Sequence, residues 1–163
     1  MRIIGIDPGT AIVGWGIVDV EDGRPKAVAY GHITTPAGMY IGERVLLIAE
    51  ELEKILDEHV PEESAVEELF FSNNAKTAMT VSQARGAILL TLGRFGVTVS
   101  GYTPNQVKQS LTSYGRADKH QMQMMVKNIL HLPDIPKPDD VADALAVAVC
   151  HSFSRKTAGL IGK

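Results

Sequence analysis

Apolar residues first recur along the chain with the short period of β-strands. Residues 3–6 form a continuous aliphatic run, and residues 12–20 and 26–34 also have strand character. An Asp-Gly pair at residues 22–23 separates the last two segments and favours a tight hairpin turn. We therefore expect three antiparallel strands at the start of the chain. Glycines inside them indicate bulges or a close approach of another backbone, at positions 14, 16 and 31.

After residue 40 the apolar period becomes that of a helix, and Pro61 ends this segment. A fourth strand is predicted over residues 64–69 and a fifth over 97–100, with a helix over 75–94 between them. Three more helices are expected to begin close to polar capping residues, at Thr103, Asp118 and Asp139. The pattern predicts an α/β fold, in which a five-stranded mixed sheet carries helices on both faces.

We expect these elements to form one domain over residues 1–154, because 163 residues suffice for a single core. Residues 155–163 are polar and contain glycine, which predicts a flexible C-terminal tail. The single cysteine, Cys150, excludes an internal disulfide and lies in an apolar run typical of a core. We recognise no signal peptide and no apolar run long enough to span a membrane, so we expect a cytoplasmic protein without membrane contact.

Charge is distributed unevenly, although the net charge is only −3. Residues 43–68 contain ten acidic residues and two basic ones, whereas residues 72–132 contain seven basic residues and one acidic one. A basic segment with so few acids to pair with favours binding to a phosphate backbone. The alternative is that these basic side chains only make the helices soluble.

Four acidic residues stand at positions suited to chemistry. Asp7 and Glu67 each end a short apolar strand, and Asp140 and Asp143 share one helical face at a spacing of three residues. Each has a simpler explanation: Asp7 could initiate its Pro-Gly turn, Asp140 could cap its helix, and Asp143 could be a solvated first-turn residue. Asp143, however, interrupts an apolar run, which is costly unless its carboxylate is paired or binds a metal.

Carboxylates that converge raise one another's pKa unless cations lie between them. Oxygen ligands without a Cys/His cluster favour Mg²⁺, with Mn²⁺ as a substitute. Two such ions, about 3.5–4 Å apart, would activate a water and stabilise the leaving oxygen of a phosphodiester. We therefore interpret the four acids as the catalytic and metal-binding residues of a nuclease.

Five motifs in order resemble the RuvC family of bacterial Holliday junction resolvases: residues 5–10 (GIDPGT), 65–67 before an aromatic residue, 83–86 (QARG), 106–109 (QVKQ) and 140–146 (DVADALA). The resemblance implies a ribonuclease-H-like fold and a homodimer that cuts two opposing strands of four-way junction DNA. It also implies Mg²⁺-dependent hydrolysis that leaves ligatable nicks, a mild preference for T-rich sites, and the branch-migration complex RuvA-RuvB as a partner. The catalytic acids of the family fall on the four acids named above.

The resemblance also suggests DNA contacts. Phe70 matches the family aromatic that inserts at the open junction, although it could instead end the strand in the core, and Phe71 could face the DNA in its place. Lys108 and Lys119 match basic residues near the scissile phosphate, although both could be merely solvated. The other predicted DNA contacts come from the basic segment and are Lys76, Arg85 and Arg116.

The helix over 75–94 is our candidate for the dimer interface. Its small residues permit close approach, and its leucines spread around more of the helix than one sheet can bury. Leu89 and Leu90 are the candidates for the outward-facing position, unless all these leucines serve the monomer's own core.

Two other functions compete with junction cleavage. A sugar-kinase or actin-like ATPase also opens with Gly-Ile-Asp-x-Gly-Thr, but such proteins use two domains of this kind. A protein that binds junctions without cutting them would need the same fold but not all four acids.

Overall fold

The computed structural model describes residues 1–68, 75–112 and 115–161, without the side chains of 75–76 and 156–161. Five strands form one sheet: β1 (Arg2–Asp7), β2 (Ile12–Glu21), β3 (Arg24–Thr34), β4 (Glu63–Glu67) and β5 (Thr98–Tyr102). The helices of the described chain are α1 (Ile41–His59), α2 (Ala75–Arg94), α3 (Pro104–Thr112), α4 (Lys119–Ile129) and α5 (Asp139–Ile161).

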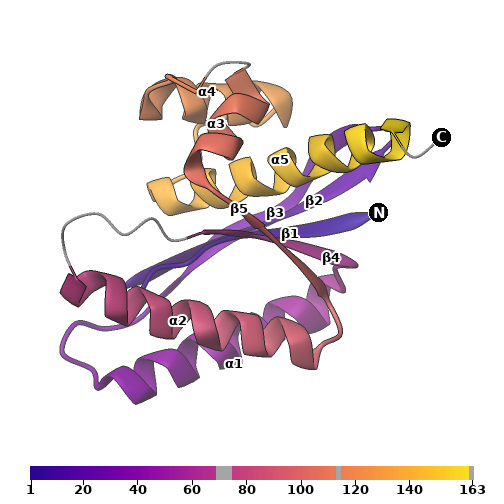
Figure 1. Ribbon diagram of the computed structural model, residues 1–163. Helices are drawn as coiled ribbons and strands as arrows, with labels where there is room; N and C mark the ends of the chain where they lie inside the picture. The colour runs from indigo at the N-terminus through magenta and orange to yellow at the C-terminus, as the bar shows by residue number, and fades with distance from the viewer. Residues whose placement is uncertain (69–74, 113–114, 162–163) are drawn as a thin grey trace.

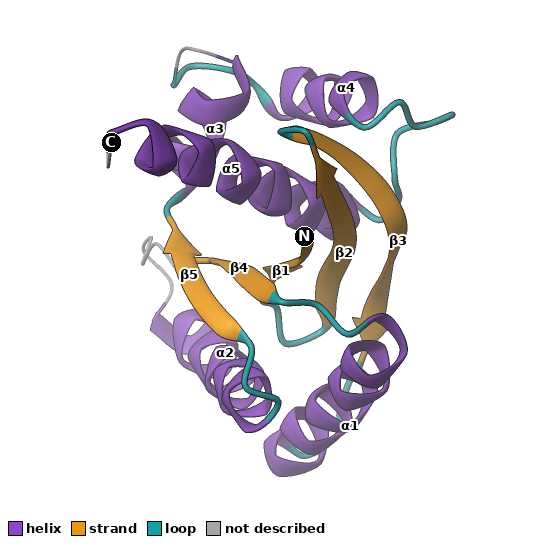
Figure 2. Ribbon diagram, turned by 90° about the vertical axis from the view of Figure 1, so that its right-hand side faces the viewer, coloured by secondary structure: helices purple, strands orange, loops and turns teal. Residues whose placement is uncertain are grey.

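The sheet is mixed, as the sequence predicts. Its strand order is β3-β2-β1-β4-β5, with antiparallel pairing among the first three strands of the chain and parallel pairing from β1 through β4 to β5. Figures 1 and 2 show α3, α4 and α5 on one face of the sheet and α1 and α2 on the other. The expected α/β architecture with helices on both faces is therefore confirmed.

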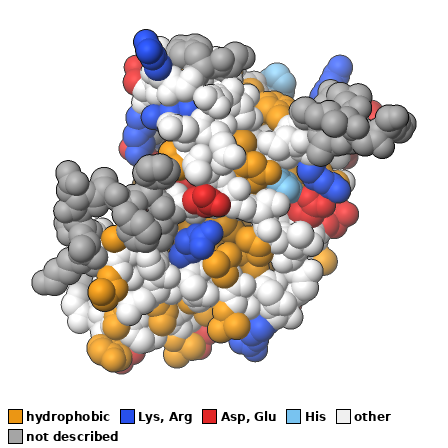
Figure 3. Space-filling model, in the orientation of Figure 1, with side chains coloured by type: hydrophobic (Ala, Val, Ile, Leu, Met, Phe, Trp, Pro, Cys, Tyr) orange, Lys and Arg blue, Asp and Glu red, His pale blue; other side chains and the backbone are white. Residues whose placement is uncertain are grey.

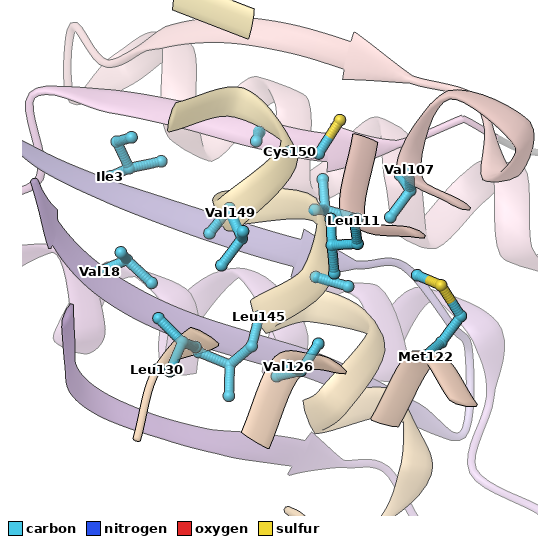
Figure 4. Close-up of a cluster of buried hydrophobic side chains, with 14 of the residues drawn as sticks. Ile3, Val18, Val107, Leu111, Met122, Val126, Leu130, Leu145, Val149 and Cys150 are labelled. Carbon is cyan, nitrogen blue, oxygen red and sulfur yellow. The ribbon is translucent and has the colours of Figure 1, made fainter. Parts of the chain in front are cut away.

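Each face of the sheet has its own hydrophobic core, because neighbouring residues of a strand point to opposite sides. Ile3 belongs to the cluster beneath α5, whereas Ile4 belongs to the cluster above α1 and α2. Figure 4 shows the first cluster, in which side chains of α3, α4 and α5 converge on β1 and β2. Cys150 lies in this cluster, which confirms its predicted core position.

Strand glycines bring α5 close to the sheet. A Cβ atom at Gly14 would collide with the carbonyl oxygen of Asp140, and one at Gly5 would collide with that of Ala144. Of the three glycines at which the sequence predicts a bulge or a close approach, Gly14 meets another backbone, whereas Gly16 and Gly31 face the side chains of Leu145 and Trp15. The bulge lies at a register shift beside Ile17. Because the helix backbone rests directly on β1 and β2, its first two turns are fixed relative to the carboxyl end of β1.

The polar caps and the hairpin turn follow the sequence. Asp22 and Gly23 both have positive φ angles, 51° and 74°, as a type I′ turn requires. Asp118 caps α4 in a capping box with Gln121, in which each side chain accepts a hydrogen bond from the other residue's backbone. The helix α5 passes residue 154 without a break and continues to Ile161. The division into a domain over 1–154 and a flexible tail therefore stays a prediction.

Candidate active site

Asp7 and Glu67 lie side by side because their strands are parallel neighbours. Ile6 of β1 pairs with Val66 of β4, so the next residue of each strand ends at the same edge of the sheet. Strand alternation directs both carboxyl groups toward α5, the side on which Ala65 packs. The two carboxyls share a hydrogen bond. This juxtaposition comes from strand pairing alone and brings together residues that are 60 positions apart.

The first two turns of α5 add two further carboxylates. Asp140 follows the first helical residue, and Asp143 lies one turn later on the same side of the helix. Both carboxylates are close enough to Asp7 to raise its pKa. The contact between Gly14 and the backbone of Asp140 is what sets this turn against the sheet.

A pocket of about 210 Å³ opens beside these carboxylates. Glu67 and Asp143 line it together with two cationic side chains, Lys108 of α3 and Lys119 of α4. The Lys119 ammonium lies 3.5 Å from the Asp143 carboxylate. Figure 3 shows that the charged side chains at the upper left of this face, where Figure 1 places α4, are mainly basic. An anionic ligand in the pocket would thus meet lysines on one wall and carboxylates on the other.

Burial and crowding strongly perturb the carboxyl groups. Burial, followed by the charge of Glu67, raises the pKa of Asp7 to about 9. Burial also raises the pKa of Glu67 and of Asp143, against the opposing effect of Lys119. The Asp7 carboxyl therefore holds a proton at neutral pH when no other cation compensates the cluster.

These residues fit a hard divalent cation by their chemistry. They offer carboxylate oxygens, and their raised pKa values indicate that Lys119 does not fully compensate their negative charge. Among the described residues, however, no group of three or more His, Cys, Asp or Glu side chains is already arranged to hold an ion. Binding would therefore require the carboxylates to lose the shared proton and reorient toward the ion.

Comparison with known proteins decides the family. The model of the family "Crossover junction endodeoxyribonuclease RuvC" matches residues 3–151. The chain belongs to the RuvC family. The RuvC protein of Ruminiclostridium cellulolyticum is 51% identical over 162 residues, which cover 99% of this chain and 98% of that protein. The RuvC protein of a Roseiflexus species is 53% identical and covers 94% of this chain and 91% of its own length.

A solved RuvC structure has the same fold. The chain superimposes on Thermus thermophilus RuvC in complex with a Holliday junction substrate with a TM-score of 0.92 and 36% identity, covering 97% and 96% of the two chains. The ribonuclease-H-like fold of RuvC proteins is therefore the fold of this chain. None of the described helices is both long and apolar enough to cross a membrane.

The structure separates the predicted DNA contacts of this RuvC protein into two sets. Lys108 and Lys119 lie at the pocket with the carboxylates, and Arg116 is exposed in the turn before α4. Arg85 instead belongs to α2, on the other face of the sheet. It is half-buried, and its Nε atom has no hydrogen-bond partner among the described residues.

Three predicted contacts lie outside what the structure describes. Phe70 and Phe71 fall in the undescribed segment 69–74. Lys76 lies in the first turn of α2, but its side chain is not described. Their roles stay predictions.

Sequence reasoning did not identify Asp139 and Gln123 as part of the site. Asp139 was expected only to start the last helix, yet its carboxylate lies 3.3 Å from the Lys119 ammonium. Gln123 is buried and donates a hydrogen bond to the same carboxylate over 3.0 Å. The only signals were the doubled acid at residues 139–140 and a polar residue among the buried positions of α4.

Proposed function

We propose that this RuvC protein resolves Holliday junctions as a homodimer, by metal-dependent hydrolysis at Asp7, Glu67, Asp140 and Asp143. The observation that carries the proposal is the convergence of Asp7 and Glu67, at the ends of two paired strands, with Asp143 at the edge of a pocket lined by lysines. A cluster of this kind destabilises a protein unless it serves to bind cations. The RuvC family, to which the chain belongs, is a family of crossover junction endodeoxyribonucleases.

In this proposal the four carboxylates would hold Mg²⁺, or Mn²⁺ in its place, and the ion would supply an activated water and positive charge beside the scissile phosphate. Asp7 must first release the proton that it shares with Glu67. Lys108 and Lys119 line the pocket and would bind phosphate oxygens of the strand that is cut. The attack of water on phosphorus breaks one P–O bond and leaves a nick that ligase can seal.

The proposed dimer surface is the outer side of α2. Two-fold symmetry is the economical way to make two symmetric cuts in one junction. Leu90 and Met79, two large apolar side chains of this helix, are 66% and 67% exposed. Leu89 is partly buried against the core beneath α2, so Leu90 is the outward-facing candidate.

A Leu90→Glu variant tests this surface directly. We expect a folded monomer that nicks junctions singly but has lost paired incision, with Leu89→Glu as the control that instead reduces stability. A Leu90→Glu protein that sediments as a dimer would remove this surface from the proposal.

Two further parts of the proposal rest on the family. We expect the protein to act with the branch-migration complex RuvA-RuvB and to work in the cytoplasm, where chromosomal junctions arise. Co-sedimentation with RuvA-RuvB on a synthetic junction would test the first.

A nicking assay on a synthetic four-way junction with Mg²⁺ tests the central proposal. We expect paired, symmetric cuts near the crossover in Mg²⁺ or Mn²⁺ and none in a metal chelator. Binding of the junction without cleavage under every metal condition would instead favour a junction-binding protein without nuclease activity.

A further inference from the structure

The carboxylate of Asp139 holds three donors from three different positions. Its Oδ1 atom accepts hydrogen bonds from the Gln123 amide over 3.0 Å and from the Lys137 ammonium over 3.1 Å. Its Oδ2 atom lies 3.3 Å from the Lys119 ammonium. Asp139 therefore has a donor for each of its oxygens before any ligand binds.

Neighbouring groups of α4 fix the positions of Asp139 and Lys119. Gln123 is only 6% exposed, so its amide cannot turn to water and keeps the Asp139 carboxylate in one orientation. The capping box at Asp118 fixes the first turn of α4, on which Lys119 is the first helical residue. Both partners of the Lys119–Asp139 pair thus start from well-defined backbone positions.

Lys119 connects this cluster to the proposed metal site. Its ammonium lies 3.3 Å from Asp139 and 3.5 Å from Asp143, so one cation bridges two carboxylates. Asp143 is the less exposed of the two, at 34% against 42% for Asp139. Among the ion pairs of the described residues, Lys137 reaches Asp139 but not Asp143.

A metal ion that uses Asp143 as a ligand must compete with the Lys119 ammonium. If Asp143 were the only partner, the ammonium would have to move into water before the ion could bind. Asp139 is a second carboxylate at nearly the same distance from the Lys119 ammonium. The ammonium can therefore leave Asp143 and remain at the pocket wall, paired with Asp139.

We propose, on the basis of the metal site proposed above, that Asp139 is a positioning residue that draws Lys119 away from Asp143 when a divalent ion binds. In the metal-free protein, before any ion binds, Lys119 is the countercation of the carboxylates. With the ion in place it remains on Asp139 at the pocket, where it faces the substrate phosphate. Asp139 itself touches neither the ion nor the DNA.

Calorimetric titration of Mn²⁺ into the DNA-free protein tests this role without measuring cleavage. Lys119→Gln removes the competing cation and should tighten Mn²⁺ binding about threefold to fivefold. Asp139→Asn leaves Lys119 with Asp143 alone and should weaken binding by a similar factor, and Asp139→Glu should restore most of it. Lys137→Gln is the matched control, because it removes the same charge from Asp139 without contact to Asp143, and it should change the Mn²⁺ affinity by less than about twofold.

A double variant separates positioning from the general effect of charge. If Asp139 acts through Lys119, Asp139→Asn should have little effect in the Lys119→Gln background. Equal tightening by Lys119→Gln and Lys137→Gln, or additive effects in the double variant, would overturn the proposal. Unfolding midpoints are measured in parallel, and the two lysine variants remain decisive if Asp139→Asn fails to fold.

The wild type and Asp7→Asn distinguish this role from the metal site itself. In one outcome the wild type binds Mn²⁺, Asp7→Asn does not, and Lys119→Gln and Lys137→Gln have the same Mn²⁺ affinity. This outcome would overturn only the positioning role of Asp139. A wild type that binds no Mn²⁺ would overturn both the metal site and this role.

Discussion

The strand β4 carries a glutamate at each end, and the two have opposite surroundings. Glu63 and Glu67 point to the same face of the sheet, where both meet α5. Glu63 lies 2.7 Å from the buried His151 ring and 2.9 Å from Arg155, and the other nitrogen of that ring lies 2.7 Å from the Tyr102 hydroxyl. Glu67 instead faces two other acidic groups, Asp7 and Asp143.

The difference shows that one end of β4 contributes to stability and the other to the proposed chemistry. At the Glu63 end each charge has a partner, so the network fastens the second half of α5 to β4 and β5. At the Glu67 end burial raises the pKa of three carboxyl groups, so their ionised forms cost the folded state stability at neutral pH unless cations bind. We therefore expect substitutions at the two ends to separate activity from stability.

The largest effect should come from the Glu67 end of β4, where the acidic groups face one another. Asp7→Asn, Glu67→Gln or Asp143→Asn should each lower the rate of junction cleavage on the order of a thousandfold or more, because each removes a proposed metal ligand. Junction affinity, measured by gel shift, should remain within a few-fold of normal, since phosphate contacts supply it. Glu63→Gln is the matched control on the same strand, and it should leave the cleavage rate per folded molecule nearly unchanged. Near-normal cleavage by any of the first three variants would remove that residue from the site.

The next effect tests the backbone contact that places α5. Gly14→Ala should destabilise the protein by about 1–3 kcal/mol, since the added methyl group collides with the Asp140 carbonyl. It should also abolish cleavage by displacing the first turn of the helix.

Gly93→Ala in α2 is the control for this effect, because a Cβ there meets no atom within 4 Å. It should stabilise the protein by about 0.5–1 kcal/mol through helix propensity. Urea unfolding of both variants measures the contrast, and a Gly14→Ala protein as stable and active as the wild type would refute the close approach.

A third test disrupts the hydrogen-bond network at the Glu63 end of β4. His151→Ala leaves the Glu63 carboxylate and the Tyr102 hydroxyl without their shared partner, which should cost about 1–3 kcal/mol of unfolding free energy. Cleavage at a temperature where the variant is folded should be nearly normal, because none of the side chains of the network lines the pocket. Loss of cleavage in a fully folded variant would instead indicate that both ends of α5 contribute to cleavage.

The last test concerns the dependence of stability on pH in the metal-free protein. The pKa of Asp7 is about 9 in the folded state and 3.8 as its ordinary value, so the folded protein binds the proton more tightly. Its contribution to stability is therefore present at low pH and is lost as pH rises through the pKa of the folded state. Urea midpoints between pH 6 and 9 in a chelator should show this slope, and Asp7→Asn should flatten it. A wild type whose stability is constant over this range would contradict the raised pKa.

Much of this protein follows from its sequence alone. The strand and helix periods determine the order and type of the described elements, because one buried face per element leaves a visible apolar pattern. Local chemistry determines the hairpin turn at Asp22 and Gly23 and the cap at Asp118, since each depends only on neighbouring residues. The acids at Asp7 and Glu67 are also visible, because a carboxylate that ends an apolar strand has no part in the core.

Other features exist only in the folded chain. The pairing of β1 with β4 brings Asp7 beside Glu67, and the contact of α5 with Gly14 brings Asp143 to them. The buried partners of Asp139 and Glu63, namely Gln123 and His151, come from other elements of the fold and leave no periodic signal. Arg85 shows the converse, because its place in a basic segment predicted a DNA contact, while the packing of α2 half-buries it on the other face of the sheet. Periodicity records which side of an element is buried, but the partner that covers a polar group is decided by which elements the tertiary fold brings together.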